Sequence, residues 1–152
     1  MSIFALPQDT PSAPPVLGPY SHVVRVSDLL IFSGQLGIDP ATGSLVSGGT
    51  EAQARQILAN IAAMLEDCGG SMPVVAKATI FLTDLGDFAA VNAVYAEAFG
   101  DHKPARTTIQ VAALPAGASI EIEILANLPI GTKGASFLSQ IAQPPQKFFG
   151  KR

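Results

Sequence analysis

The sequence predicts a single α+β domain, in which two helices cover one face of a mixed β-sheet. Its 152 residues and 15.7 kDa suit one domain. Two helix-patterned segments lie among β-rich runs in the order β-β-α-β-α-β-β, without a regular βαβ repeat. We expect one domain over residues 1–130 and an extension over residues 131–152. A flexible extension is favoured over an arm docked through its phenylalanines.

The first two strands are predicted to form a hairpin. Residues 23–26 and 29–32 are β-rich, and only Ser27 and Asp28 separate them, which suits a two-residue turn. Residues 1–19 contain five prolines, which disfavour a helix or a central strand. This segment is therefore predicted as a lead-in arm.

The first helix is predicted to start at a capping box. Thr50 stands three residues before Gln53, so its hydroxyl can satisfy a free amide of the first turn. An apolar stripe with helical spacing follows, and Gly69 and Gly70 supply the C-terminal stop.

A buried strand and a second helix are predicted next. Residues 74–82 are expected to be a strand buried on both sides. Asp84 or Asp87 would cap a helix that runs to about Phe99. Asn92 lies within the apolar stripe of this helix, so its amide is expected to satisfy polar groups nearby.

Polar side chains alternate along the last two predicted strands, 106–112 and 119–128. If these strands pair as a hairpin, one sheet face carries Arg106, Thr108, Gln110, Glu121 and Glu123. A solvated face is the simple interpretation. Charge is scarce elsewhere, however, which favours a walled cleft. There Arg106 could clamp a carboxylate, and the proximity of the two glutamates would raise a pKa and suit base catalysis.

Composition excludes several functions. Four of the nine cations lie beyond residue 130 and all twelve acids precede it, so residues 1–130 carry a net charge of −7. This charge disfavours a nucleic-acid partner. Only 14% of residues are charged, so we expect apolar surface to be buried by self-association. One cysteine and two histidines give no metal-binding spacing. No leader pattern or membrane-length apolar run is present, so a cytoplasmic location is expected.

Six short motifs over about residues 15–128 resemble the RidA/YjgF family of reactive-intermediate deaminases. They are Gly18-Pro-Tyr-Ser21, Ile31-Phe-Ser-Gly-Gln35, Gln53-Ala-Arg-Gln56, Val91-Asn-Ala-Val-Tyr95, Pro104-Ala-Arg106 and Ile120-Glu-Ile-Glu123. The resemblance implies a chorismate-mutase-like fold, a homotrimer, no cofactor and no metal. It also implies ligand sites in clefts between subunits.

The resemblance further implies a site and a reaction. Arg106 would hold the substrate carboxylate and Glu121 would orient the attacking water. Other matching pocket positions are Tyr20, Ser33, Gly34 and Asn92. Thr108 stands where many members have cysteine, so we count it as substrate-binding.

The implied activity is that of a 2-iminobutanoate/2-iminopropanoate deaminase, which hydrolyses imino acids to 2-oxo acids and ammonia. The alternative is a non-catalytic module that binds small carboxylates such as 2-oxo acids. Ribonuclease activity is disfavoured by the acidic body. Mutase chemistry is disfavoured because one clamp arginine is too few for a dicarboxylate.

Overall fold

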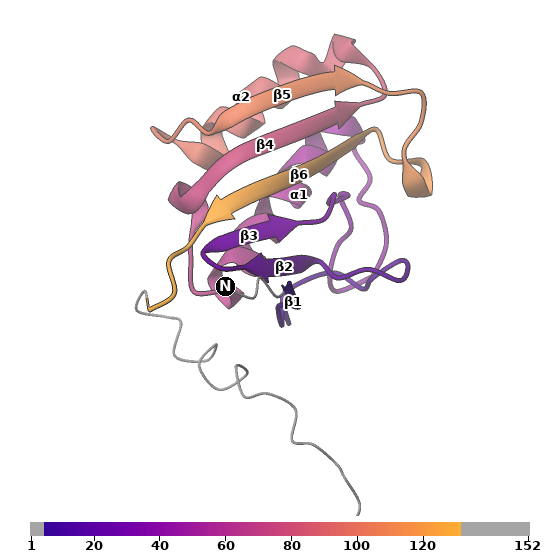
Figure 1. Cartoon of the computed structure of the whole chain (residues 1–152). Helices are drawn as coiled ribbons and strands as arrows, with labels where there is room; N and C mark the ends of the chain where they lie inside the picture. The colour runs from indigo at the N-terminus through magenta and orange to yellow at the C-terminus, as the bar shows by residue number, and fades with distance from the viewer. Residues whose placement is uncertain (1–4, 132–152) are drawn as a thin grey trace, which may run out of the picture.

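The structure is a computed structural model that describes residues 5–131. It has one sheet of six strands, in the order β1-β2-β3-β6-β4-β5, and both helices lie on one face of it (Figure 1). The strands are β1 Leu6–Pro7, β2 Val23–Val26, β3 Leu29–Phe32, β4 Val75–Leu82, β5 Ala105–Gln110 and β6 Ile120–Asn127, and the helices are α1 Gly49–Asp67 and α2 Phe88–Phe99. The predicted fold class is confirmed. From residue 132 onward, the predicted extension lies outside the described residues. Within residues 5–131, neither helix has both the length and the hydropathy needed to cross a membrane.

The local strand predictions hold at the start of the chain. β2 and β3 form the predicted antiparallel hairpin, with Val26 opposite Leu29. Ser27 in the turn takes φ 54°, the left-handed conformation that a tight hairpin turn requires. Part of the proline-rich arm is an edge strand, because β1 pairs with β2.

The predicted hairpin between residues 106–112 and 119–128 is wrong. β4 lies between β5 and β6, parallel to β5 and antiparallel to β6. The chain leaves β4, passes through α2 and returns as the neighbouring parallel strand, a crossover that places β5 at the sheet edge. The other side of β4 is then filled by β6.

The predicted single polar face is therefore wrong as well. Arg106 lies opposite Ala78, which is fully buried on the face covered by the helices. Glu121 lies opposite Phe81, on the open face. Because side chains alternate along a strand, Thr108 shares the face of Arg106 and Glu123 shares the face of Glu121.

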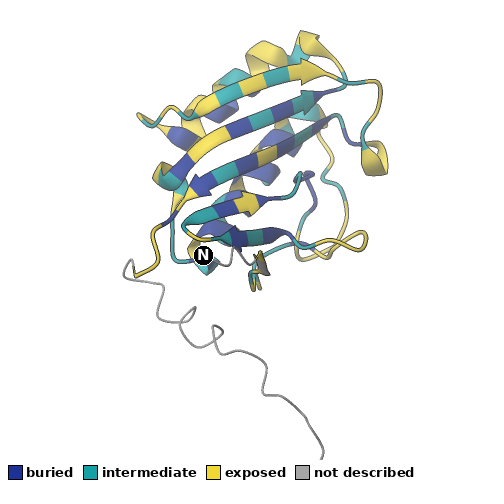
Figure 2. Ribbon diagram, in the orientation of Figure 1, coloured by how far each residue is buried: buried dark blue, intermediate teal, exposed yellow. Residues whose placement is uncertain are grey.

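The core lies between the helices and one face of the sheet. Its largest fully buried side chains are Leu30, Phe32, Ile57, Ile61, Met64, Leu65, Ile80, Leu82, Ile120, Ile122, Ile124 and Leu128. Burial alternates along β4 and β6 (Figure 2). β4 is thus buried on one face only within the chain, not on both faces as predicted. Burial of each such side chain contributes about 1.5–3 kcal/mol.

The start of α1 differs from the prediction, whereas the end of α1 and the start of α2 agree with it. Gly48, not Thr50, is the N-cap of α1, and no side chain caps it. Thr50 donates instead to the Asp87 carboxylate, tying the start of α1 to the segment before α2. Asp87, one of the two predicted caps, is the N-cap residue of α2, although its side chain makes no capping hydrogen bond. The side chain of Asp84, the other, caps the short turn Leu85–Asp87. α1 ends at Asp67, just before the predicted glycine stop.

Candidate active site

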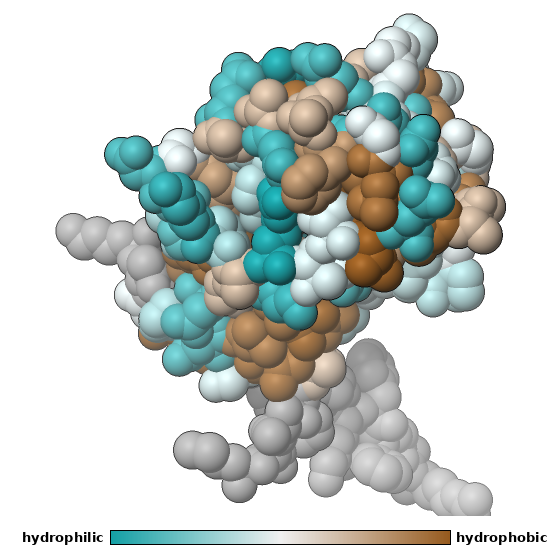
Figure 3. All heavy atoms as spheres, turned by 90° about the horizontal axis from the view of Figure 1, so that it is seen from above, coloured by the Kyte–Doolittle hydropathy of each residue, from teal (hydrophilic) through white to brown (hydrophobic). Residues whose placement is uncertain are grey.

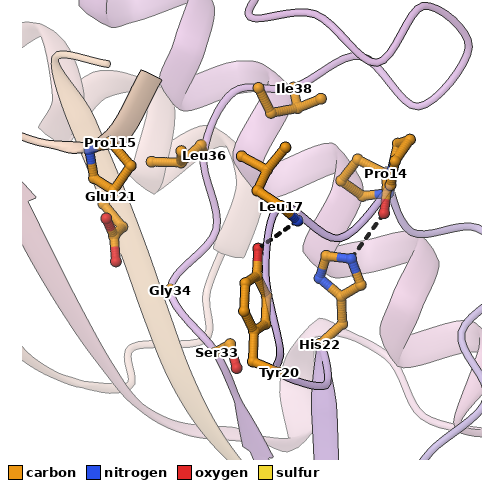
Figure 4. Close-up of a pocket in the computed structure, with 11 residues that line it drawn as sticks. Pro14, Leu17, Tyr20, His22, Ser33, Gly34, Leu36, Ile38, Pro115 and Glu121 are labelled. Carbon is orange, nitrogen blue, oxygen red and sulfur yellow. Dashed lines mark hydrogen bonds between the residues drawn. The ribbon is translucent and has the colours of Figure 1, made fainter. Parts of the chain in front are cut away.

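A cavity of about 350 Å³ opens beside Glu121, and we call it the Glu121 cavity. It is lined by Pro14, Pro15, Leu17, Tyr20, His22, Ser33, Gly34, Leu36, Ile38, Pro115 and Glu121 (Figure 4). Most of these residues are apolar. The few polar groups include the Glu121 carboxylate and the hydroxyls of Tyr20 and Ser33. The segment after β3, the arm before β2 and β6 all contribute to the wall.

Gly34 is required by the position of Glu121. A Cβ atom at residue 34 would overlap the Glu121 carboxylate, lying 2.7 Å from Cδ and 3.0 Å from Cγ. Carbon atoms in contact normally lie about 3.5–4.0 Å apart. The missing side chain therefore lets the carboxylate lie directly against the backbone of the segment after β3, as Figure 4 shows.

Buried polar side chains hold this segment in place. Ser33 donates from Oγ to the Ser21 carbonyl at 2.7 Å, and Gln35 donates from Nε2 to the Ser33 carbonyl at 2.8 Å. Asn60 of α1 donates from Nδ2 to the Ile38 carbonyl at 2.8 Å. These bonds leave the Ser33 hydroxyl oxygen with accepting capacity and fix Gly34 relative to β6.

The pKa of Glu121 lies above its usual range. Partial burial is the main cause, and the neighbouring Glu123 carboxylate adds to it. Within residues 5–131, Glu121 makes neither an ion pair nor a hydrogen bond. A carboxylate with a raised pKa and no partner suits proton transfer to and from a bound water.

A second cavity, of about 340 Å³, lies beside Arg106, and we call it the Arg106 cavity. It is lined by Asn92, Tyr95, Ala96, Phe99, Gly100, His102, Lys103, Pro104 and Arg106. The guanidinium lies 5.0 Å from the ring centre of Tyr95 and 5.5 Å from that of Phe88. These cation–π contacts hold the guanidinium in place without neutralising it.

Several polar groups around Arg106 lack partners. In the described part of the chain, the buried hydroxyls of Tyr95 and Thr108 make no hydrogen bond. Burial raises the pKa of Tyr95, and Arg106 opposes this shift. The Asn92 amide was predicted to satisfy nearby groups, but among residues 5–131 it makes no hydrogen bond. The expectation was wrong because the Asn92 side chain lines the cavity and does not form a hydrogen bond with a backbone group of residues 5–131.

The two cavities belong to opposite faces of the sheet. The structure groups Tyr20, Ser33 and Gly34 with Glu121, and Asn92 with Arg106. Since the sheet separates Arg106 from Glu121, one chain cannot place both on one small molecule. Each cavity thus contains one of the two charged groups, and a single chain does not bring them together. Among residues 5–131, no group of three or more potential ligands could hold a metal ion.

Sequence reasoning missed the aromatic support of Arg106. Phe88 and Tyr95 belong to the apolar stripe of the second predicted helix, and no contact with Arg106 was expected of them. Phe88 is 41% exposed, and its ring contacts the guanidinium. Their spacing of seven residues, two helical turns, is the sequence signal that could have suggested a shared partner.

Comparison with known proteins identifies the family. The sequence model of the family described as "Endoribonuclease L-PSP" matches residues 10–128. A 2-iminobutanoate/2-iminopropanoate deaminase from Capra hircus is 49% identical over 117 residues, 77% of this chain and 85% of the relative. A RutC family protein from Pyrococcus horikoshii is 47% identical over 117 residues, 77% of this chain and 93% of the relative.

Solved structures agree with the sequence match. The crystal structure of RidA from an Antarctic Psychrobacter has a TM-score of 0.78 and 43% identity, and the alignment covers 81% of this chain and 99% of that one. The family model spans strands β2 to β6, both helices and the residues that line both cavities. The chain therefore belongs to the Endoribonuclease L-PSP family, which is the RidA/YjgF family that its motifs resemble.

Proposed function

We propose that this protein is a 2-iminobutanoate/2-iminopropanoate deaminase, an enzyme that hydrolyses 2-imino acids to 2-oxo acids and ammonia. The names of relatives such as those from Capra hircus and Homo sapiens, at 49% and 45% identity, support this activity. The observation that carries the proposal is a pair of oppositely charged residues, Arg106 and Glu121, each of which lines a cavity and makes no ion pair within residues 5–131. A carboxylate clamp and a general base are what the reaction needs.

The active site forms, in this proposal, between copies of the chain in a homotrimer. Arg106 of one copy and Glu121 of the next would face one cleft, since their own sheet keeps them apart. The open sheet face supports assembly because it carries Ile31 and Ile109, which are 38% and 43% exposed. Hydrophobic side chains also gather among hydrophilic ones at the edge formed by β5 and α2, onto which Figure 3 looks. Burying such patches favours association.

The proposed reaction needs no cofactor. The guanidinium of Arg106 binds the substrate carboxylate through two N–H groups and so orients the imine. The Glu121 carboxylate takes a proton from a water molecule as the water oxygen bonds to the imine carbon. This proton passes to the nitrogen, which gives a carbinolamine. Glu121 then takes the proton of the carbinolamine hydroxyl and delivers it to the amino nitrogen, so that the C–N bond breaks, ammonia leaves and the C=O bond forms. The Thr108 hydroxyl lies on the face of Arg106, where it can contribute to substrate binding.

An assay with imino acids generated in situ tests this function. Ammonia release from 2-iminobutyrate should fall by at least about 100-fold in Arg106→Ala, because the charged bidentate contact is lost. Arg55→Ala removes an exposed cation from α1 and is the matched control, with rates expected near wild type. Unchanged turnover in Arg106→Ala would contradict the assignment.

Calorimetry with 2-oxobutyrate separates the enzyme from a binding module. Binding by the wild type without any acceleration of imine hydrolysis would support the non-catalytic alternative. The proposal also includes a cytoplasmic location and a functional unit within residues 1–130.

A further inference from the structure

A second cation lines the Arg106 cavity. Lys103 and Arg106 both contribute to its wall, together with His102, and none of its lining residues is acidic. Asp101 is exposed and does not line the cavity. Among residues 5–131, ion pairs are made by Arg55, and neither Lys103 nor Arg106 takes part in one. Two cationic residues, the exposed Lys103 and the half-buried Arg106, therefore line the cavity, and neither makes an ion pair within residues 5–131.

The backbone that carries Lys103 is held on both sides. His102 donates from its backbone N–H to the Phe99 carbonyl at 3.1 Å, and its ring Nε2 lies 2.7 Å from the Val75 carbonyl. Pro104 follows Lys103 directly and restricts the backbone there. The lysine thus projects from a fixed point at the cavity wall, and only its side chain needs to adjust to a ligand.

The Glu121 cavity is unsuited to a second negative group of the substrate. The Glu121 cavity contains a carboxylate and apolar walls that include Leu17, Leu36 and Ile38. A ligand carboxylate there would be repelled by Glu121 and would lose its hydration. A second acidic group of a substrate must therefore lie on the side of Lys103.

We propose that Lys103 is a specificity-determining residue that admits imino acids with a second carboxylate, such as those derived from glutamate or aspartate. Arg106 holds the carboxylate next to the imine, and the Lys103 ammonium pairs with the carboxylate of the substrate side chain. The cavity volume of about 340 Å³ lies within the range of small-molecule sites, and both cationic residues line it. The inference rests on the proposed function, whose substrate class it names.

Binding and turnover test the inference together. Calorimetry compares 2-oxoglutarate with 2-oxobutyrate as product-like probes, and the coupled assay compares kcat/KM for 2-iminoglutarate and 2-iminobutyrate. Both use the full chain of wild type, Lys103→Met and Lys103→Arg. Arg55→Gln, an exposed cation of α1, is the charge-matched control.

Lys103→Met should lower the preference for the dicarboxylic over the monocarboxylic ligand by about ten-fold, since a charge-assisted contact is lost. Lys103→Arg should restore most of this preference, and Arg55→Gln should leave it unchanged. An equal loss for both ligands, or no loss for either, would overturn the inference.

The two proposals fail in distinguishable ways. Hydrolysis of 2-iminobutyrate with a preference that ignores Lys103 would overturn the inference alone. If no imino acid is hydrolysed but 2-oxoglutarate binding still depends on Lys103, the deaminase assignment fails and the dicarboxylate site stands.

Discussion

Replacing Gly34 by alanine should displace the Glu121 carboxylate and so lower the activity, although Glu121 itself is not substituted. The new Cβ would lie 2.7 Å from Glu121 Cδ and 3.0 Å from Cγ, whereas about 3.5–4.0 Å is the normal contact distance. The carboxyl group must therefore move by about 1 Å. A misplacement of about 1 Å corresponds to about a 100-fold loss of rate, or about 2.7 kcal/mol in the activation free energy.

The assay is ammonia release from 2-iminobutyrate, run as a double-mutant cycle. In a Glu121→Ala background the collision disappears, so Gly34→Ala should cause no further loss. Gly18→Ala is the control, because its Cβ would meet only the Tyr20 ring at 3.4 Å or more. Full activity in Gly34→Ala, or an equal loss in both backgrounds, would refute the reasoning.

Four further outcomes are expected. The raised pKa of Glu121 means that wild-type kcat/KM falls as pH drops through it, because the protonated carboxyl group cannot accept a proton from water; an activity that stays constant as the pH is lowered would contradict this role. A carboxyl group whose pKa is raised in the folded state stabilises the fold at pH values below its unfolded-state pKa, and this contribution is lost as the pH rises through the folded-state pKa. The free energy of unfolding, measured with urea, should therefore be higher for Glu121→Gln than for wild type at pH 7 but not at pH 4. Ile61→Ala should lower the free energy of unfolding by about 2–5 kcal/mol, because Ile61 is fully buried; a change within error would contradict the packing described for α1. Burial raises the pKa of the Cys68 thiol to about 11, so a thiol reagent should label it only after unfolding, and rapid labelling of the native protein would contradict this.

Locally encoded features of the fold were predictable from the sequence. The hairpin of β2 and β3 follows from two β-rich runs separated by two residues. The end of α1 follows from Gly69, which takes φ 85° after the last turn. The helix start was not predictable in detail, because Thr50 has a better partner in Asp87, which is distant in sequence.

The pairing of the later strands, and the sheet face on which their side chains lie, were not predictable. Alternation separates the two sides of a strand, but it does not say which side the helices cover. Arg106 belongs to the helix side because β5 pairs in parallel with β4, and that pairing depends on the crossover through α2. The site residues were suggested by the family resemblance, and the structure adds that Arg106 and Glu121 line two separate cavities on opposite faces of the sheet.

Complementation between inactive variants tests most directly whether the active site is shared between copies. Arg106→Ala and Glu121→Gln should each be inactive alone. When the two variants are unfolded together at equal concentration and refolded, about one site in four should combine an intact Arg106 with an intact Glu121 from a neighbouring copy in a cyclic trimer. We predict recovery of about a quarter of wild-type imine hydrolysis. A mixture that stays inactive, although both variants refold and assemble, would contradict the shared site.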